Sequence, residues 1–210
     1  MPVKLGIMGG TFNPIHYGHL VTAEEALVQF GLDEVVFTPC GIPAHKVEGP
    51  VAPAEDRYLM AVIATASNPD LRVSRMEIDR AGVSYTVDTL RQSTAERPEA
   101  ELFFITGADA VWEILTWKEA DEAAKLCTFI AATRPGYDLT RFQKLHAHAP
   151  EEGRHDGPRL VAMEIPALAI SSTDIRHRVA DGRPIRYLLP EGVASFIGKA
   201  GLYRSDGSAS

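Results

Sequence analysis

Length and composition place the chain among ordinary globular proteins. Its 210 residues, 45% hydrophobic and 23% charged, suffice for one domain with a sizeable core and exclude disordered, collagen-like and disulfide-stapled classes. The 28 acidic residues against 21 basic ones give a formal charge of -7, which favours neither nucleic acid nor an anionic membrane as a partner. No apolar run reaches the roughly 18 to 20 residues of a membrane span.

Short β-rich runs alternate with segments of helical period along the chain. Apolar runs predict strands at Val3–Met8, Glu34–Pro39, Leu71–Ile78, Glu101–Thr106, Thr128–Thr133 and Arg159–Ile165. Periodicity and end signals predict a helix that ends before Gly31 and further helices at Glu55–Ser67, Thr86–Arg97, Leu139–His148, Ser172–Ala180 and Glu191–Ala200. This alternation predicts an α/β fold, a doubly wound, Rossmann-like parallel sheet with a ligand cleft at the carboxyl ends of the strands.

The two cysteines, Cys40 and Cys127, indicate a reducing compartment. The sequence shows no basic-then-apolar leader, so we expect free thiols and a cytoplasmic protein. We expect a single domain over residues 1–203, which includes a small C-terminal helical part, and a disordered tail over residues 204–210. The polar stretch 149–158 is interpreted as a surface loop.

The first predicted strand is followed by a loop rich in glycine and histidine. The chain reads GGTFNPIHYGH from Gly9 to His19 and then enters an amphipathic helix. A glycine pair lets backbone N–H groups approach an anion closely, and the helix start adds the positive end of its dipole. The loop therefore predicts a phosphate site, although it matches neither the dinucleotide fingerprint nor the P-loop pattern.

His16 and His19 lie three residues apart at this helix start, with Gly18 between them to leave room. Both rings can lie on one helix face and point into the same cleft, where they would donate hydrogen bonds to phosphate oxygens. Two alternatives stay open here: a helix cap with two solvated histidines, and a zinc pair, for which no third ligand is obvious.

A second anion site is predicted after the last strand. The sequence ISSTDIR starts at Ile170; in it Ser171 and Asp174 form a helix-capping pattern, and Arg176 falls near the first turn. An ordinary capped helix with a solvated arginine is the alternative. Two phosphate-suited helix starts in one parallel-sheet domain favour the anion site.

The two segments together resemble the nucleotidyltransferase superfamily, which shares H-x-G-H with class I aminoacyl-tRNA synthetases and carries I-S-S-T-x-x-R where the synthetases have K-M-S-K-S. Two further patterns, SYTVDTL from Ser84 and Gly107-Ala-Asp109 with Trp117 eight residues later, are similar to those of bacterial nicotinate-mononucleotide adenylyltransferases. The resemblance covers about residues 1–203. A Pro- and Gly-rich loop, PCGIPAHK, suits a lid whose lysine is either solvated or closes over a triphosphate.

The resemblance implies adenylyl transfer from ATP to nicotinate mononucleotide, which yields deamido-NAD and pyrophosphate in NAD biosynthesis. Mg²⁺ would come with ATP rather than from a protein metal site, and a homo-oligomer is possible. The rival activities are phosphopantetheine adenylyl transfer and nucleotide binding without turnover. The catalytic residues that the resemblance implies are His16, His19, Lys46 and Arg176. The ATP contacts that it implies are Gly9, Gly10, Thr11, Phe12, Gly107, Asp109, Arg134, Ile170, Ser171 and Ser172. The nicotinate-nucleotide contacts that it implies are Asn13, His45, Tyr85, Thr86 and Trp117.

Two residues depart from the family pattern. Asn13 stands where many members carry aspartate, and Ala44 stands where a second proline is common. Asparagine removes a charge but keeps an acceptor, so we expect activity to persist; Ala44 loosens the expected lid.

Overall fold

The structure is a computed structural model of the chain, and it describes residues 2–43, 49–108, 119–136 and 159–205. Its centre is a sheet of six parallel strands, in the order β4 (Leu71–Val73), β2 (Glu34–Pro39), β1 (Lys4–Gly10), β6 (Glu101–Gly107), β7 (Thr128–Thr133) and β8 (Arg159–Glu164). The order reverses between β1 and β6, as in doubly wound nucleotide-binding sheets. A second, short sheet pairs β3 (Ile42–Pro43) with β5 (Val83–Ser84).

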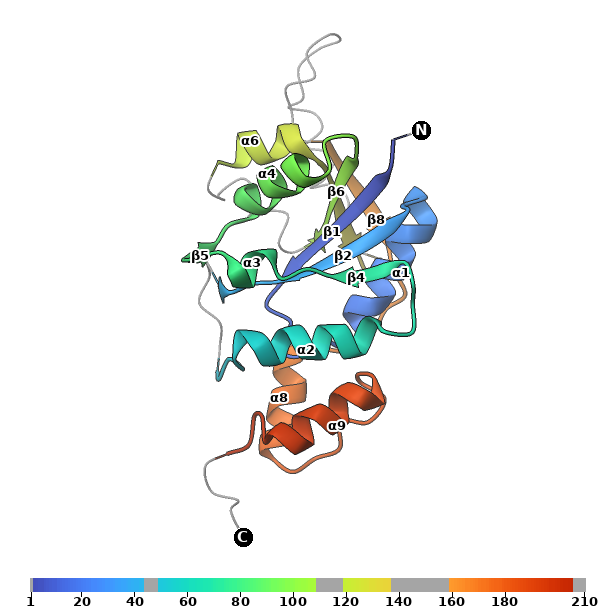
Figure 1. The fold of residues 1–210 in the computed structure, drawn as a ribbon. Helices are drawn as coiled ribbons and strands as arrows, with labels where there is room; N and C mark the ends of the chain where they lie inside the picture. The colour runs from blue at the N-terminus through green and yellow to red at the C-terminus, as the bar shows by residue number, and fades with distance from the viewer. Residues whose placement is uncertain (1, 44–48, 109–118, 137–158, 206–210) are drawn as a thin grey trace.

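Helices cover both faces of the central sheet (Figure 1). On one face α4 (Thr86–Glu96) and α6 (Ala120–Leu126) share a core with Leu102 and Phe104 of β6. On the other face Phe103 and Ile105 share a core with α1 (Tyr17–Phe30), α2 (Ala54–Thr65), α8 (Ser172–Ala180) and α9 (Glu191–Ala200). Consecutive residues of β6 thus point to opposite apolar layers, which is why this strand is apolar throughout. None of the described helices is long and apolar enough to cross a bilayer.

Most predicted elements are confirmed, as is the doubly wound α/β class. The two short strands Glu34–Pro39 and Thr128–Thr133 and the last two helices have the predicted bounds. The first helix ends before Gly31, whose left-handed φ of 59° closes it as a C-cap. The predicted helix at 139–148 and the loop at 149–158 lie outside the described residues. Ends shift by only one or two residues for Val3–Met8, Glu101–Thr106, Arg159–Ile165, Glu55–Ser67 and Thr86–Arg97.

The predicted strand Leu71–Ile78 is wrong beyond Val73. The strand β4 stops there, and the helical turn α3 (Met76–Asp79) follows. The hydroxyl of Ser74 accepts a hydrogen bond from the backbone N–H of Met76 at 3.2 Å, a local bond that favours a turn over a strand ladder. An apolar run this short does not distinguish strand from helix in sequence. The elements β3, β5 and α6 are not among the predicted ones.

Candidate active site

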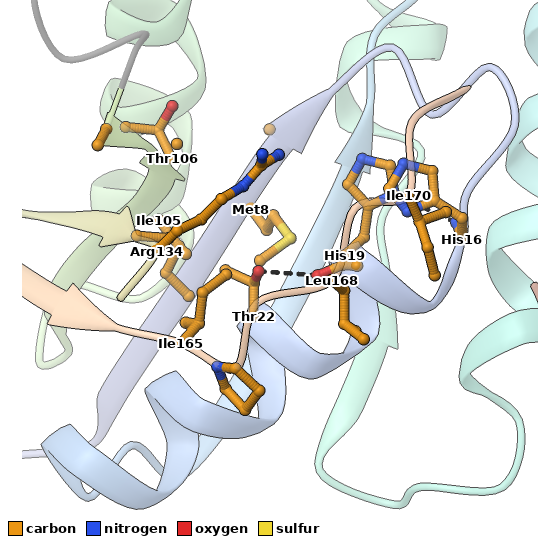
Figure 2. A pocket seen from close by; sticks show the side chains of 16 residues that line it. Met8, His16, His19, Thr22, Ile105, Thr106, Arg134, Ile165, Leu168 and Ile170 are labelled. Atoms are coloured by element: carbon orange, nitrogen blue, oxygen red, sulfur yellow. Dashed lines mark hydrogen bonds between the residues drawn. The ribbon is translucent and has the colours of Figure 1, made fainter. Parts of the chain in front are cut away.

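A cavity of about 540 Å³ opens at the carboxyl ends of β1, β6 and β7. The start of α1 and the segment after β8 complete its walls (Figure 2). This is the point at which the strand order reverses, where open parallel sheets bind their ligands. Six of the predicted site residues line the cavity: Gly9, His16, His19, Gly107, Arg134 and Ile170.

His16 and His19 stack against each other at the start of α1. Their ring centroids lie 3.8 Å apart with an interplanar angle of 28°, and Figure 2 shows the two rings side by side. The backbone N–H of His16 donates to Nδ1 of His19 at 3.2 Å. Because Nδ1 accepts, the neutral His19 ring carries its proton on Nε2, which leaves Nε2 as a hydrogen-bond donor.

Both imidazoles are neutral near pH 7 in this structure. Burial lowers the pKa of His16 to about 4. Burial, and then the neighbouring His16, lowers the pKa of His19 well below its usual value. The Nδ1 atom of His16 is buried and has no hydrogen-bond partner among the described residues. Such unsatisfied buried atoms are rare and often mark functional sites.

Two alternatives for the histidine pair can now be judged. His16 does occupy the N-cap position of α1, but it is buried, so the alternative of two solvated cap histidines does not hold. Within the part of the chain that the structure describes, no group of three or more His, Cys, Asp or Glu residues is placed to hold a metal ion.

Gly18 gives the His16 ring its space. A Cβ atom at this position would lie 2.9 Å from both Cε1 and Nδ1 of His16, closer than real contacts allow. Any side chain here would therefore displace the ring. The stacked pair therefore requires a residue without a side chain between the two histidines, as the sequence suggested.

Phe12 supports the pair from the core side. Its ring is buried and meets His19 edge to face, with 5.1 Å between ring centroids, and it also packs against Phe37. A Cβ atom on Gly10 would lie 3.1 Å from the Phe12 ring. The glycine and phenylalanine of the first loop thus fix the position of His19, and neither Gly10 nor Phe12 lines the cavity.

Asn13 uses its side chain on the protein itself. It is 2% exposed; its Nδ2 donates to the carbonyl of Pro50 at 2.9 Å. Its Oδ1 accepts from the backbone N–H of Ala52 at 3.0 Å and from the hydroxyl of Tyr203 at 2.8 Å. The structure therefore gives the Asn13 side chain a place beneath the loop rather than in the cavity wall. The bond to Pro50 needs an amide donor, which an aspartate lacks.

The ISSTDIR segment meets the first loop directly. Ser172 Oγ donates to the carbonyl of Pro14 at 2.8 Å, and Arg176 Nη1 donates to the carbonyl of Asn13 at 2.9 Å. Ser171 accepts from the backbone N–H of Asp174 at 3.1 Å, so the predicted cap of α8 is confirmed. The Arg176 side chain is buried and does not line the 540 Å³ cavity. It borders a second cavity of about 280 Å³ behind the loop instead.

The remaining predicted contacts lie elsewhere. Tyr85 and Thr86 start α4 on the opposite face of the sheet, and neither lines the 540 Å³ cavity. Thr11 is the first residue after β1 and is likewise absent from the lining. Lys46, His45, Asp109 and Trp117 fall outside the described residues, so their placement stays a prediction.

Sequence reasoning missed the lining residues Thr22 and Thr106 and also Arg57, which contacts the first loop. Its guanidinium is 1% exposed and donates to the carbonyl of Thr11 in the first loop at 2.8 Å. A signal was present: Arg57 precedes Met60 and Ala61 by three and four residues, which places a cation on the apolar face of a predicted helix.

Comparison with known proteins decides the family. A family model described as cytidylyltransferase-like matches residues 7–178. A protein of Moorella thermoacetica, described as "Probable nicotinate-nucleotide adenylyltransferase", is 58% identical over 97% of this chain and 93% of its own. A protein of Streptomyces coelicolor with the same description is 54% identical over 95% of this chain and 100% of its own. The chain belongs to the nicotinate-nucleotide adenylyltransferases of the cytidylyltransferase-like family.

Two solved structures share the fold of this chain. The Plasmodium falciparum nicotinic acid mononucleotide adenylyltransferase complexed with NaAD superposes with a TM-score of 0.75 at 19% identity, over 96% of this chain and 97% of that one. A putative nicotinate-nucleotide adenylyltransferase from Vibrio parahaemolyticus gives a TM-score of 0.65 at 20% identity. These structures confirm the predicted fold, and the relatives at 58% and 54% identity confirm the resemblance to nicotinate-nucleotide adenylyltransferases.

Proposed function

We propose that the protein transfers the adenylyl group of ATP to nicotinate mononucleotide. The 5′-phosphate oxygen of the mononucleotide forms a bond to the α-phosphorus of ATP, the bond from that phosphorus to the bridging oxygen breaks, and pyrophosphate leaves. The product is deamido-NAD. The observation that carries this proposal is the stacked pair of neutral imidazoles in the wall of a cavity at the switch point of the sheet.

The attacking phosphate needs no general base, because a phosphate monoester already carries about 1.5 to 2 negative charges at neutral pH. The protein must instead align two anions and stabilise the oxygens of the α-phosphoryl group. His16 and His19 are suited to this task because a neutral imidazole still donates a hydrogen bond from one ring nitrogen. The N–H of His19 at Nε2 is the donor that the geometry leaves available.

Lys46 and Arg176 complete the proposed set around the departing pyrophosphate. In this structure Arg176 donates a hydrogen bond to the carbonyl of Asn13, and it thereby helps to position the first loop. The proposed adenosine contacts are Gly107, Asp109 and Arg134, and the backbone of residues 9–12 with Ile170, Ser171 and Ser172 surrounds the phosphates. His45, Tyr85, Thr86 and Trp117 are the proposed contacts of the nicotinate nucleotide, with Asn13 acting through the loop.

Mg²⁺ is proposed to accompany ATP. The described lining of the cavity holds threonine hydroxyls but no carboxylate. Because Mg²⁺ prefers oxygen ligands such as carboxylates, phosphates and water, this lining does not fit a metal held by the protein alone, and no step is assigned to it. A cytoplasmic location is proposed as well, since both described cysteines are buried and free.

Three acceptors test the proposed reaction in one experiment. The protein is incubated with ATP, Mg²⁺ and either nicotinate mononucleotide, nicotinamide mononucleotide or phosphopantetheine, and the release of pyrophosphate is measured. We expect the fastest release with nicotinate mononucleotide. Release with phosphopantetheine alone would assign the rival activity, and no release with any acceptor would indicate a binding module without turnover.

A further inference from the structure

Arg57 is a buried cation whose acceptors are all uncharged. From α2 its Nε donates to the carbonyl of Ala52 at 3.0 Å, its Nη1 to the carbonyl of Thr11 at 2.8 Å, and its Nη2 to the carbonyl of Gly41 at 3.0 Å. Nη1 also reaches the thiol of Cys40 at 3.6 Å. No carboxylate in the described ranges lies within ion-pair distance of this guanidinium.

The three carbonyls come from three segments that are separate in the sequence. Thr11 belongs to the loop between β1 and α1, whereas Gly41 and Ala52 flank the stretch 42–51. One side chain therefore ties both ends of that stretch to the first loop. Because the peptide group is planar and trans, holding the Thr11 carbonyl also fixes the N–H of Phe12 in the opposite direction.

A backbone hydrogen bond also joins the end of β1 to the residue that follows β2. The backbone N–H of Cys40 donates to the carbonyl of Gly10 at 3.0 Å. The guanidinium is the only side chain with a rigid fork of five donors, so it can bind three carbonyls in fixed directions. A lysine at this position keeps the charge but has a single, flexible ammonium group, which cannot hold all three segments in register.

We propose that Arg57 is a positioning residue for adenylyl transfer, an inference that rests on the proposed function. It holds the first loop against the segments that contain Gly41 and Ala52, so that the loop keeps the arrangement in which His16 and His19 lie in the cavity wall. It does not touch substrate itself. Small displacements of such groups from the reactive geometry lower turnover by about 100-fold.

The test compares Arg57→Lys and Arg57→Met with a core control, Ile197→Val, which lies buried in α9. The rates of pyrophosphate release with ATP and nicotinate mononucleotide are measured well below each melting temperature. We expect kcat to fall at least about tenfold in both Arg57 variants, with KM for ATP within about threefold of the parent value. Ile197→Val is expected to lower the melting temperature and leave kcat unchanged, because it removes one methyl group from the apolar core and leaves every hydrogen bond of Arg57 in place.

A second readout does not depend on activity. Hydrogen exchange of the folded Arg57→Lys protein is expected to quicken together in peptides covering residues 9–13, 40–43 and 49–53. Parent kcat in Arg57→Lys, or faster exchange confined to α2, would overturn the inference even if Arg57→Met fails to fold. If the parent protein itself released no pyrophosphate, the proposed function would fail instead, and the exchange experiment would still judge the tie between the loops.

Discussion

His16 is a buried, neutral imidazole, and its burial makes stability depend on pH. The pKa of this ring is lowered from 6.5 to about 4 in the folded protein. Between these values the unfolded chain binds a proton that the folded protein does not, so the free energy of unfolding falls as pH drops from 6.5 towards 4. At about 1.4 kcal/mol per pH unit, the loss from this residue is about 3 kcal/mol.

His16→Asn tests this dependence at the residue scale. Asparagine suits an N-cap position, so α1 can still start there, but it does not titrate. Urea unfolding at a series of pH values should show a shallower loss of stability below pH 6.5 in the variant than in the parent. Equal slopes in the two proteins would contradict the account of His16 as a buried neutral ring.

Gly18 is the second residue whose role rests on the geometry of the histidine pair. The alanine Cβ of Gly18→Ala would come within 2.9 Å of the His16 ring, so the ring must leave its present position. We expect kcat to fall on the order of 10- to 100-fold, because the imidazole no longer lies where the phosphate oxygen needs a donor. Gly198→Ala is a suitable control, since a Cβ at that position meets open space. Parent turnover in Gly18→Ala would refute the steric argument.

At the scale of elements, the C-terminal end of the chain supports the first loop. The hydroxyl of Tyr203, just beyond α9, donates to Oδ1 of Asn13 at 2.8 Å across 190 positions. The variant Tyr203→Phe leaves one acceptor contact unmade in a buried network, so we expect a loss of about 1 kcal/mol in the free energy of unfolding. Tyr187→Phe should cost nothing, because Tyr187 is 82% exposed. The test is the urea concentration at the unfolding midpoint of each variant. Equal midpoints in the two variants would contradict a stabilising role for the Tyr203 hydroxyl.

The elements differ in how far sequence could predict them. Strands β2 and β7 and helices α8 and α9 carry apolar runs or caps that specify their ends locally, and their predicted bounds hold. The strand predicted over Leu71–Ile78 failed because the Ser74 hydroxyl starts a turn at a point where the apolar residues fit either structure. The pairing of β3 with β5 depends on contacts between segments about 40 positions apart, which no local pattern reveals.

At the scale of the whole molecule, two motifs far apart in sequence form one neighbourhood. The sequence indicated both anion-suited segments, and the bonds from Ser172 and Arg176 to the first loop bring them together. It did not indicate that the Arg176 guanidinium lies behind the loop, nor that Arg57 supports the loop from α2. Such placements follow from the packing of α2, α8 and the loop around Asn13, and so from tertiary structure rather than from local pattern.

The fold also explains how an acidic protein can bind a polyphosphate. With a net charge of -7, the molecule as a whole repels anions. The described cavity instead offers two imidazoles, Arg134 and the start of α1 at one end of the sheet. The attraction for a polyphosphate is therefore local. If a hydrogen-bond donor is removed from the cavity wall, the net charge of the protein does not compensate for the loss.

The most direct measurement of the central claim is the turnover of His19→Ala with ATP and nicotinate mononucleotide. Removing one positioned donor to a transition-state oxygen typically costs about 2.7 to 4 kcal/mol, or roughly 100- to 1000-fold in rate. We predict a loss of this size with a melting temperature close to the parent value, and no loss in His177→Ala, whose side chain is exposed on α8. Folded His19→Ala protein that releases pyrophosphate at the parent rate would contradict the account.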